Sequence, residues 1–258
     1  MLGKDLCKEP AWIRTQIACV AQHISIDAHL SLMENMIFQS RLYKVDAQVA
    51  KERINSLIDS FELSRYLKYP IASYSDGVKR RLDIAMSMVS SPKILFLDEP
   101  TVGMDVESRK AMWKMLLKIR DEHGTTIFLT THYLEEADQL SDTICIMKEG
   151  KELAQGTPGS LRSYTRQNML RIAFSSVEGT RKYKDALDST GLIKFTSVRD
   201  NSVFVGVDDS RTAFTDVNKW LLDHHVEFDA IEIVESSLED VFLALTGSGE
   251  YRGEEWVC

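Results

Sequence analysis

The chain has 258 residues, a formal net charge of −8, 44% hydrophobic residues and 27% charged residues, which is ordinary for one large globular domain or for a domain with a smaller companion. The acidic excess argues against nucleic acid as the main partner, because phosphate backbones are bound by basic surfaces. No run approaches the roughly 18 apolar residues that span a bilayer. We therefore expect a soluble chain that reaches a membrane only through a partner.

The first part of the chain predicts a short strand, then helices, then a second strand. Residues 17–20 predict a buried strand that ends just before Gln22. Apolar residues spaced by three and four predict helices over 33–44 and 47–61. Ser75 is a good N-cap for a helix that runs to about Ser90. The continuous apolar run at 93–97 is typical of a strand buried on both faces, as in a parallel sheet.

Helices and strands then alternate. The sequence predicts, in order, a helix over 105–122 that Gly124 terminates, a strand over 125–130, a helix near 133–140, a strand over 143–148 and a turn at 149–151. This alternation predicts crossover connections and a parallel sheet. We expect an α/β domain over residues 1–166, with residues 28–90 as a helical subdomain.

A different pattern follows residue 166. It predicts strand 169–175, helix 180–189, strands 193–199 and 202–207 joined by a turn at 200–201, helix 211–224, strand 228–235 and a last helix over 237–245. The order β-α-β-β-α-β is that of a ferredoxin-like α+β module, expected over 167–247. Residues 248–258 are expected to form a flexible tail.

Two adjacent acids, Asp98 and Glu99, close the run at 93–97. The last residues of a parallel strand lie at the carboxyl edge of the sheet, where ligands bind. Asp98 could hold Mg²⁺ directly or through water, and Glu99 could polarise an attacking water; phosphoryl transfer needs both roles. Taken alone, the pair could also be two solvated acids at a strand end.

His132 follows the strand after that pair by one crossover, so we expect it at the same edge as Glu99. An imidazole there could hydrogen-bond a terminal phosphate oxygen. A purely structural role is the alternative for a lone histidine.

Ser75 and Gly77 open the predicted helix that ends near Ser90. A helix N-terminus with a hydroxyl and a glycine backbone is an anion site, although capping alone would also explain Ser75. The three cations that follow, at positions 79–81, are expected to be solvated or held in salt bridges.

In their chain order these segments resemble the ATP-binding-cassette (ABC) family. Gln22 looks like the Q-loop glutamine, and His132 looks like the switch histidine. Residues 74–78 look like the signature motif, 94–98 like Walker B with Glu99 in the catalytic position, and 102–105 like the D-loop. The strings LFLDEPTVGMD and FLTTHYLEEAD are most similar to exporter ATPases of the drug-resistance and lipid-export type.

The resemblance implies an ATP-binding and ATP-hydrolysing subunit of an exporter. Two such subunits would pair head to tail around two ATP molecules, and nucleotide-driven closure would be coupled to a transmembrane permease. The chain would thus be cytoplasmic and peripheral on the inner face of the cell membrane. The implied roles are catalysis for Glu99, His132 and Gln22; nucleotide contact for Ser75, Gly77, Asp98 and Asp105; and Mg²⁺ binding for Asp98 and Gln22.

The sequence departs from the family pattern at the phosphate-binding P-loop. No G-x-x-x-x-G-K-[ST] string occurs; in the family it would fall before Met1. The expected fold is therefore an incomplete cassette of the P-loop-NTPase type. Two explanations stay open. The chain is a truncated form of an ATPase, or it is a P-loop-less, non-catalytic or regulatory partner that lends its signature to another subunit's ATP.

A second departure is Asp76, where the family usually has glycine. A carboxylate about 5 Å from a γ-phosphate charge would cost on the order of 3 kcal/mol at an effective dielectric near 20. The cost disappears if Asp76 points away, and a negative charge at a helix N-terminus is itself favourable.

Overall fold

The computed structural model describes residues 1–164, 168–176, 180, 183–184, 186–187, 193, 195–207, 209–234 and 237–246. The chain forms two compact units, Met1–Leu140 and Ser141–Cys258. The predicted domain boundaries near 166 and 247 stay predictions, and the predicted tail at 248–258 lies outside the described residues.

The first unit contains every helix and strand that the sequence predicts for this region, and also three short elements that were not predicted, α1 and two 3-10 helices. Its elements are α1 (Pro10–Gln16), β1 (Ile17–Val20), α2 (Leu32–Leu42), α3 (Ala47–Ser60), the 3-10 helices η1 (Ser64–Tyr66) and η2 (Ile71–Ser73), α4 (Asp76–Met88), β2 (Ile94–Asp98), α5 (Val106–His123), β3 (Thr126–Thr130) and α6 (Leu134–Leu140).

Side-chain caps explain where the longer helices begin. Ser31 and Glu34 form a reciprocal capping box at α2, and Asp46 accepts two backbone N–H groups at the start of α3. Ser75 caps α4 and Asp105 caps α5. Each cap satisfies a backbone donor that the helix itself leaves unpaired.

Gly124 ends α5 as predicted. Its φ is 60°, in the left-handed region, and its N–H donates to the carbonyl of Arg120 at 3.1 Å. We expect Gly124→Ala to destabilise the first unit by about 1–2 kcal/mol, because a Cβ is unfavourable in this conformation. Urea unfolding measures this, and Gly124→Asn is the control because asparagine tolerates the left-handed region better. Equal stability of the alanine variant and the parent would contradict this account of the helix end.

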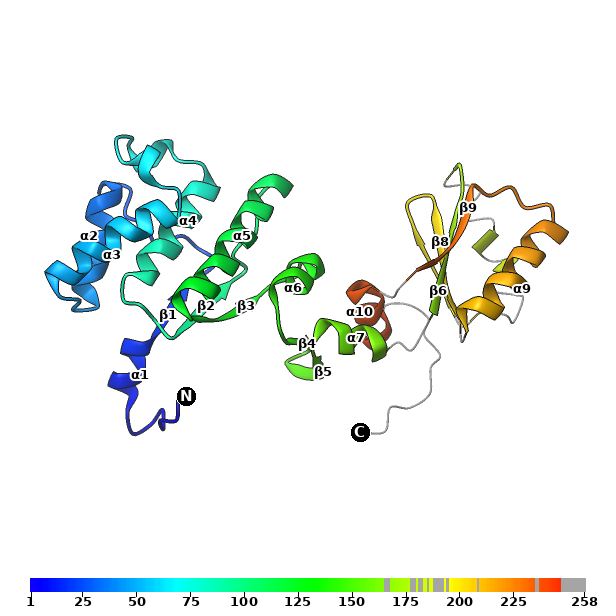
Figure 1. The fold of residues 1–258 in the computed structure, drawn as a ribbon, viewed down its shortest axis with the longest axis horizontal. Coiled ribbons are helices and arrows are strands. Elements are labelled where there is room, and N and C mark those ends of the chain that lie inside the picture. The colour runs from blue at the N-terminus through cyan, green and yellow to red at the C-terminus, as the bar shows by residue number, and fades with distance from the viewer. Residues whose placement is uncertain are drawn as a thin grey trace. The chain divides into compact units, whose positions relative to one another are not determined.

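The sheet of the first unit is parallel, with strand order β1-β2-β3. Ala18, Leu95 and Leu97 on one face join the core formed with α4 and α5; Figure 1 shows these helices beside the sheet. On the opposite face Phe96 is only half-buried and Phe128 is 59% exposed. The prediction that β2 is buried on both faces is therefore wrong for the described residues, since helices cover only one face.

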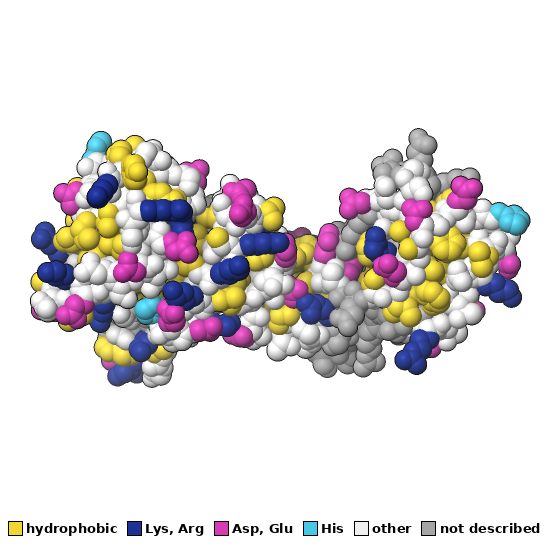
Figure 2. All heavy atoms as spheres, turned by 45° about the horizontal axis from the view of Figure 1, so that its top comes forward, with side chains coloured by type: hydrophobic (Ala, Val, Ile, Leu, Met, Phe, Trp, Pro, Cys, Tyr) yellow, Lys and Arg dark blue, Asp and Glu magenta, His cyan; other side chains and the backbone are white. Residues whose placement is uncertain are grey.

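The helical layer consists of α2, α3 and α4, and residues 29–90 contain no strand, as predicted. Its core includes Met36, Ile54 and Leu82, all nearly inaccessible to solvent. Two large apolar residues of α2, Phe38 and Leu42, are instead exposed. Figure 2 shows apolar side chains mixed with charged ones on the surface of the helical layer.

The second unit combines a hairpin with an antiparallel sheet. Its described elements are β4 (Ile144–Lys148), β5 (Lys151–Gly156), α7 (Pro158–Tyr164), β6 (Asn168–Ala173), β7 (Phe195–Arg199), β8 (Ser202–Val207), α9 (Ser210–Asp223), β9 (Ala230–Val234) and α10 (Leu238–Thr246). The predicted turn at 149–151 joins β4 to β5, a strand that was not predicted, with positive φ at Glu149 and Gly150.

The four-stranded sheet has the order β7-β8-β6-β9, antiparallel throughout. This is the order of the predicted ferredoxin-like module, in which the first and third strands are central. The predicted helix 180–189 is described only at Thr180, Tyr183, Lys184, Ala186 and Leu187, which are helical; its other residues lie outside the described ranges. None of the helices in the described ranges combines the length and apolar character that crossing a bilayer requires.

Candidate active site

The carboxyl ends of the three parallel strands bring the predicted catalytic residues to one edge of the sheet. Asp98 is the last residue of β2, and Glu99 follows it. Gln22 lies two residues beyond β1, and His132 lies two residues beyond β3. Neighbouring parallel strands end at the same edge, so residues 77 and 33 positions from Glu99 in sequence become its neighbours.

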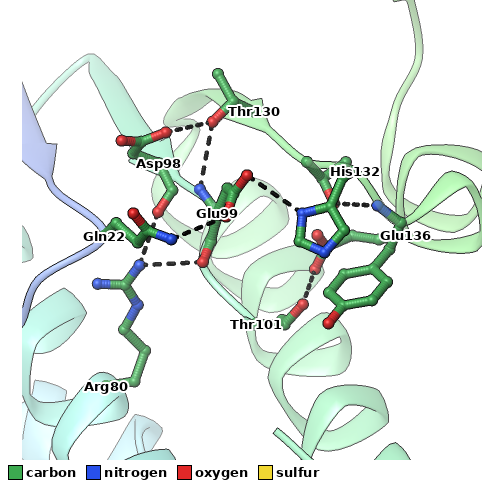
Figure 3. A network of polar contacts seen from close by, with 10 residues as sticks. Gln22, Arg80, Asp98, Glu99, Thr101, Thr130, His132 and Glu136 are labelled. Atoms are coloured by element: carbon green, nitrogen blue, oxygen red, sulfur yellow. Dashed lines mark hydrogen bonds and ion pairs between the residues drawn. The ribbon is translucent and has the colours of Figure 1, made fainter. Parts of the chain in front are cut away.

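Glu99 is the centre of this group. Gln22 Nε2 donates to Glu99 Oε2 at 3.0 Å, and His132 Nδ1 lies 3.2 Å from Glu99 Oε1. Figure 3 shows the amide and the imidazole approaching the carboxylate from opposite sides. The expected convergence of Glu99 and His132 on one edge is therefore observed. A neutral Nδ1–H or an imidazolium would each donate to this carboxylate.

Asp98 is held by a neighbour that the sequence did not single out. Thr130 Oγ1 donates to Asp98 Oδ1 at 2.6 Å across the β2–β3 pair, while no described residue donates to Oδ2. Mg²⁺ binds to one or two carboxylates, waters and substrate phosphates rather than to all-protein cages. The Asp98 carboxylate, with one oxygen that accepts no described hydrogen bond, fits that requirement. The described residues contain no cluster of three or more metal-binding side chains. We call Gln22, Asp98, Glu99, Thr130 and His132 the carboxyl-edge cluster.

The backbone of Glu99 is strained. Its φ is 44°, an uncommon value for a residue with a Cβ. Its N–H donates to the carbonyl of Thr130 at 3.1 Å and lies 3.3 Å from Thr130 Oγ1. Such conformations cost on the order of 1–3 kcal/mol and persist where the surrounding contacts fix them. This backbone conformation turns the chain sharply after β2 and places the Glu99 carboxylate between Gln22 and His132.

Ser75, Gly77 and Asp105 form a second group, at the starts of α4 and α5. Ser75 Oγ accepts from the N–H of Val78 at 3.4 Å. Asp105 accepts from the N–H and the hydroxyl of Ser108, at 2.9 and 2.6 Å, and these bonds hold its pKa below the usual value. A side chain added at Gly77 would lie 4.0 Å from Ser108. No described hydrogen bond or ion pair joins this group to the carboxyl-edge cluster.

Comparisons with known proteins agree with this arrangement. The ABC transporter family model matches residues 1–102. The daunorubicin/doxorubicin resistance ATP-binding protein DrrA of Streptomyces peucetius is 37% identical over 250 residues, covering 96% of this chain and 74% of that protein. This chain belongs to the ATP-binding proteins of ABC transporters.

Other relatives agree with the family and with the fold. The Nod factor export ATP-binding protein I of Burkholderia orbicola is 35% identical over 162 residues, covering 61% of this chain and 53% of that protein. A solved ATP-binding subunit of an ABC transporter superposes with a TM-score of 0.54 at 25% identity, covering 64% of this chain and 68% of that one. The predicted family, the exporter-type relatives and the α/β cassette fold are therefore confirmed.

Asp76, which departs from the family pattern expected from the sequence, is the first residue of α4. Its side chain is 88% exposed, and Lys79 Nζ lies 3.6 Å from Asp76 Oδ1. A carboxylate in the first turn is favoured by the helix dipole. Asp76 thus lies exposed at a helix N-terminus, one of the two arrangements expected to offset repulsion between its carboxylate and a γ-phosphate.

Helix α4 also carries Arg80, whose charge is paired with Asp83 in a buried salt bridge rather than solvated. Lys79 and Arg81 form the expected salt bridges with exposed acids, but Arg80 is only 4% exposed. Burial lowers the pKa of its guanidinium, and burial also raises the pKa of Asp83, whose Oδ2 lies 3.8 Å from Arg80 Nη1. Helical spacing could have indicated that Arg80 is buried, since it precedes the buried Ile84 by four residues.

Aromatic and acidic neighbours that sequence reasoning missed surround His132. The Tyr133 ring lies 4.2 Å from the His132 ring, and the Arg109 guanidinium lies 3.9 Å from the Tyr133 ring, a cation–π distance. Behind them Glu136 is fully buried and accepts from Thr101 Oγ1 at 2.8 Å and from Trp113 Nε1 at 2.9 Å.

Proposed function

We propose that this chain is an ATP-hydrolysing subunit of an exporter, in which the carboxyl-edge cluster acts on the terminal phosphate of one bound ATP. The observation that carries the proposal is the position of Glu99, which is hydrogen-bonded to Gln22, lies 3.2 Å from His132 and is next to Asp98 in sequence. A base, a polar residue able to orient water, a residue for the metal and a phosphate sensor thus share one edge.

The chemistry follows from these contacts. Glu99 accepts a proton from the attacking water, while the Gln22 amide orients that water. His132 donates a hydrogen bond to the γ-phosphate oxygen that gains charge. Asp98 and Gln22 would hold Mg²⁺, whose positive charge neutralises the phosphate oxygens. Thr130 keeps Asp98 turned toward the cluster.

The phosphate cradle is not among these 258 residues. We propose that the phosphates facing this cluster are held by a P-loop that another segment supplies. We also propose that Ser75 and the N-terminus of α4 contact a second ATP, held by a paired subunit. The alternative candidate function is that of a partner that only lends its signature to another subunit's ATP and does not hydrolyse ATP itself.

The relatives are named as resistance and export ATP-binding proteins, which supports a permease as membrane partner. A groove of about 410 Å³ between α2 and α3, lined by Met33, Ile37 and Ile54 among others, supports contact of the helical layer with that partner. Co-purification with a co-expressed candidate permease tests this, and recovery of the chain without any membrane subunit would oppose it.

Ser75→Ala tests the role of the signature helix. We expect it to lower ATP-dependent pairing of the subunits and the ATPase rate of the assembled transporter by about tenfold or more, because one phosphate contact is lost. The loss of the cap should also cost about 1 kcal/mol of stability. Light scattering with ATP or ADP, and phosphate release, are the measurements.

Ser31→Ala is the matched control, since Ser31 caps α2 through the same kind of bond. It should lower stability similarly and leave pairing and hydrolysis unchanged. If both variants reduced hydrolysis equally, the effect would come from stability and the signature role would be lost.

A further inference from the structure

Arg80 joins three parts of the cassette that are separate in sequence. Its Nη2 donates to the carbonyl oxygens of Asp98 at 2.8 Å and Glu99 at 3.3 Å, and its Nε donates to that of Pro100 at 3.1 Å. Its Nη1 donates to the carbonyl oxygen of Ala21. Figure 3 shows the guanidinium below Asp98, Glu99 and Gln22. One side chain of α4 therefore binds the backbone on both sides of the Gln22–Glu99 hydrogen bond.

The carbonyl groups of Ala21, Glu99 and Pro100 lie outside the β1–β2 ladder, whereas Asp98 is still paired with Thr130 of β3. The β1–β2 pairing ends at Val20 and Leu97. At Glu99 the chain also adopts its strained positive φ. Arg80 supplies donors to the carbonyls on each side of the Glu99 turn, and a planar guanidinium can do so with several N–H groups at fixed angles.

Asp83 contacts both Arg80 and Ser25, which lies three residues after Gln22. Its carboxylate accepts from the Ser25 hydroxyl, and the N–H of Ser25 lies 3.4 Å from Asp83 Oδ2. Asp83 is 3% exposed. A buried ion pair of this kind often adds little stability relative to apolar residues, because both charges lose water. The hydrogen bonds of Arg80 to the backbone of the cluster therefore point to a role in positioning the cluster residues.

We propose that Arg80 is a positioning residue that sets the Gln22–Glu99 contact and transmits the position of the signature helix to it. Arg80 does not touch the reacting atoms. Movement of α4 shifts the carbonyl groups of Ala21 and Glu99 together, because they share one rigid donor. The kinetic consequence rests on the proposed ATPase function, whereas the geometric consequence does not.

The first test uses the chain by itself. Selective ¹⁵N labelling of glutamine reports the two side-chain amide protons of Gln22, and Glu99→Ala identifies the signal of an amide without its acceptor. We expect Arg80→Lys to fold, because it keeps the charge beside Asp83, and to move the Gln22 signal toward that of Glu99→Ala. Arg81→Lys is the matched control, since the described hydrogen bonds of the Arg81 side chain go to Phe61 and Glu62 and not to the carboxyl-edge cluster.

The second test measures hydrolysis by the assembled transporter. Arg80→Lys should lower kcat on the order of 10²-fold with KM for ATP within about twofold, since displacement near 1 Å costs this much. Arg81→Lys should leave both unchanged. A folded Arg80→Lys variant with the parental Gln22 signal overturns the proposal. So does an unfolded one, because Arg80 would then be a determinant of stability. Absence of hydrolysis in the parent transporter removes only the proposed function, because the amide test needs no nucleotide.

Discussion

Glu99→Gln is expected to lower the ATPase rate of the assembled transporter by about 10²- to 10⁴-fold, the range for loss of a general base. The amide has nearly the same shape and its oxygen can still accept from Gln22 or His132, but it cannot take a proton from water. ATP-dependent pairing should persist, because no described hydrogen bond or ion pair joins Glu99 to the group at the starts of α4 and α5. Phosphate release and light scattering on the same samples separate the two effects.

Glu135→Gln is the control, since Glu135 is an exposed acid three residues after His132. It should leave both measurements unchanged. If Glu99→Gln also kept the parental rate while Ser75→Ala reduced it, the chain would be a partner that lends its signature only, and Glu99 would not be the base.

Glu136→Ala is expected to destabilise the first unit by roughly 3–5 kcal/mol. Glu136 is fully buried, and its Oε1 accepts from both Thr101 and Trp113. Removing it leaves two buried donors without an acceptor, at about 1–3 kcal/mol each, and removes two bonds to a carboxylate. Urea unfolding followed by Trp113 fluorescence, with the other tryptophans replaced, reports the loss.

Glu136→Gln is the informative comparison. Its amide oxygen can accept both bonds, and Glu136 Oε2 has no hydrogen-bond partner among the described residues. Replacing that oxygen by an NH2 group removes the buried charge but buries N–H donors without a described acceptor, so we expect Glu136→Gln to cost about 1–3 kcal/mol, less than Glu136→Ala. A Glu136→Gln variant as unstable as Glu136→Ala would mean that the charge itself, rather than the two bonds, stabilises α6.

The fold of the first unit could be predicted because its local signals agree with its packing. Strands β1, β2 and β3 read as apolar runs, and Ser75 and Gly124 mark helix ends with residue types that suit them. The convergence of Glu99 and His132 followed from one topological rule, that neighbouring parallel strands end at the same edge. Strand β5 was missed because Leu153 and Ala154 are its only apolar side chains.

The neighbours of the cluster could not be predicted in the same way. Glu136 and Thr101 are 35 residues apart, and Arg80 is 59 residues from Ala21; packing alone brings them together. A sequence reading also treats the three adjacent cations at 79–81 alike, although helical spacing turns Arg80 inward. The exposed face at Phe128 was missed because an apolar run does not tell which face helices cover.

The central claim is that the residues of the carboxyl-edge cluster all act on the same nucleotide. The most direct measurement is the structure of the assembled transporter with Glu99→Gln, trapped with Mg²⁺ and ATP. We predict that His132 and the side chain at position 99 approach the same γ-phosphate within about 4 Å, and that Asp98 and Gln22 contact its metal. A structure with His132 and Asp98 on different nucleotides, or with the cluster remote from any phosphate, would contradict the account.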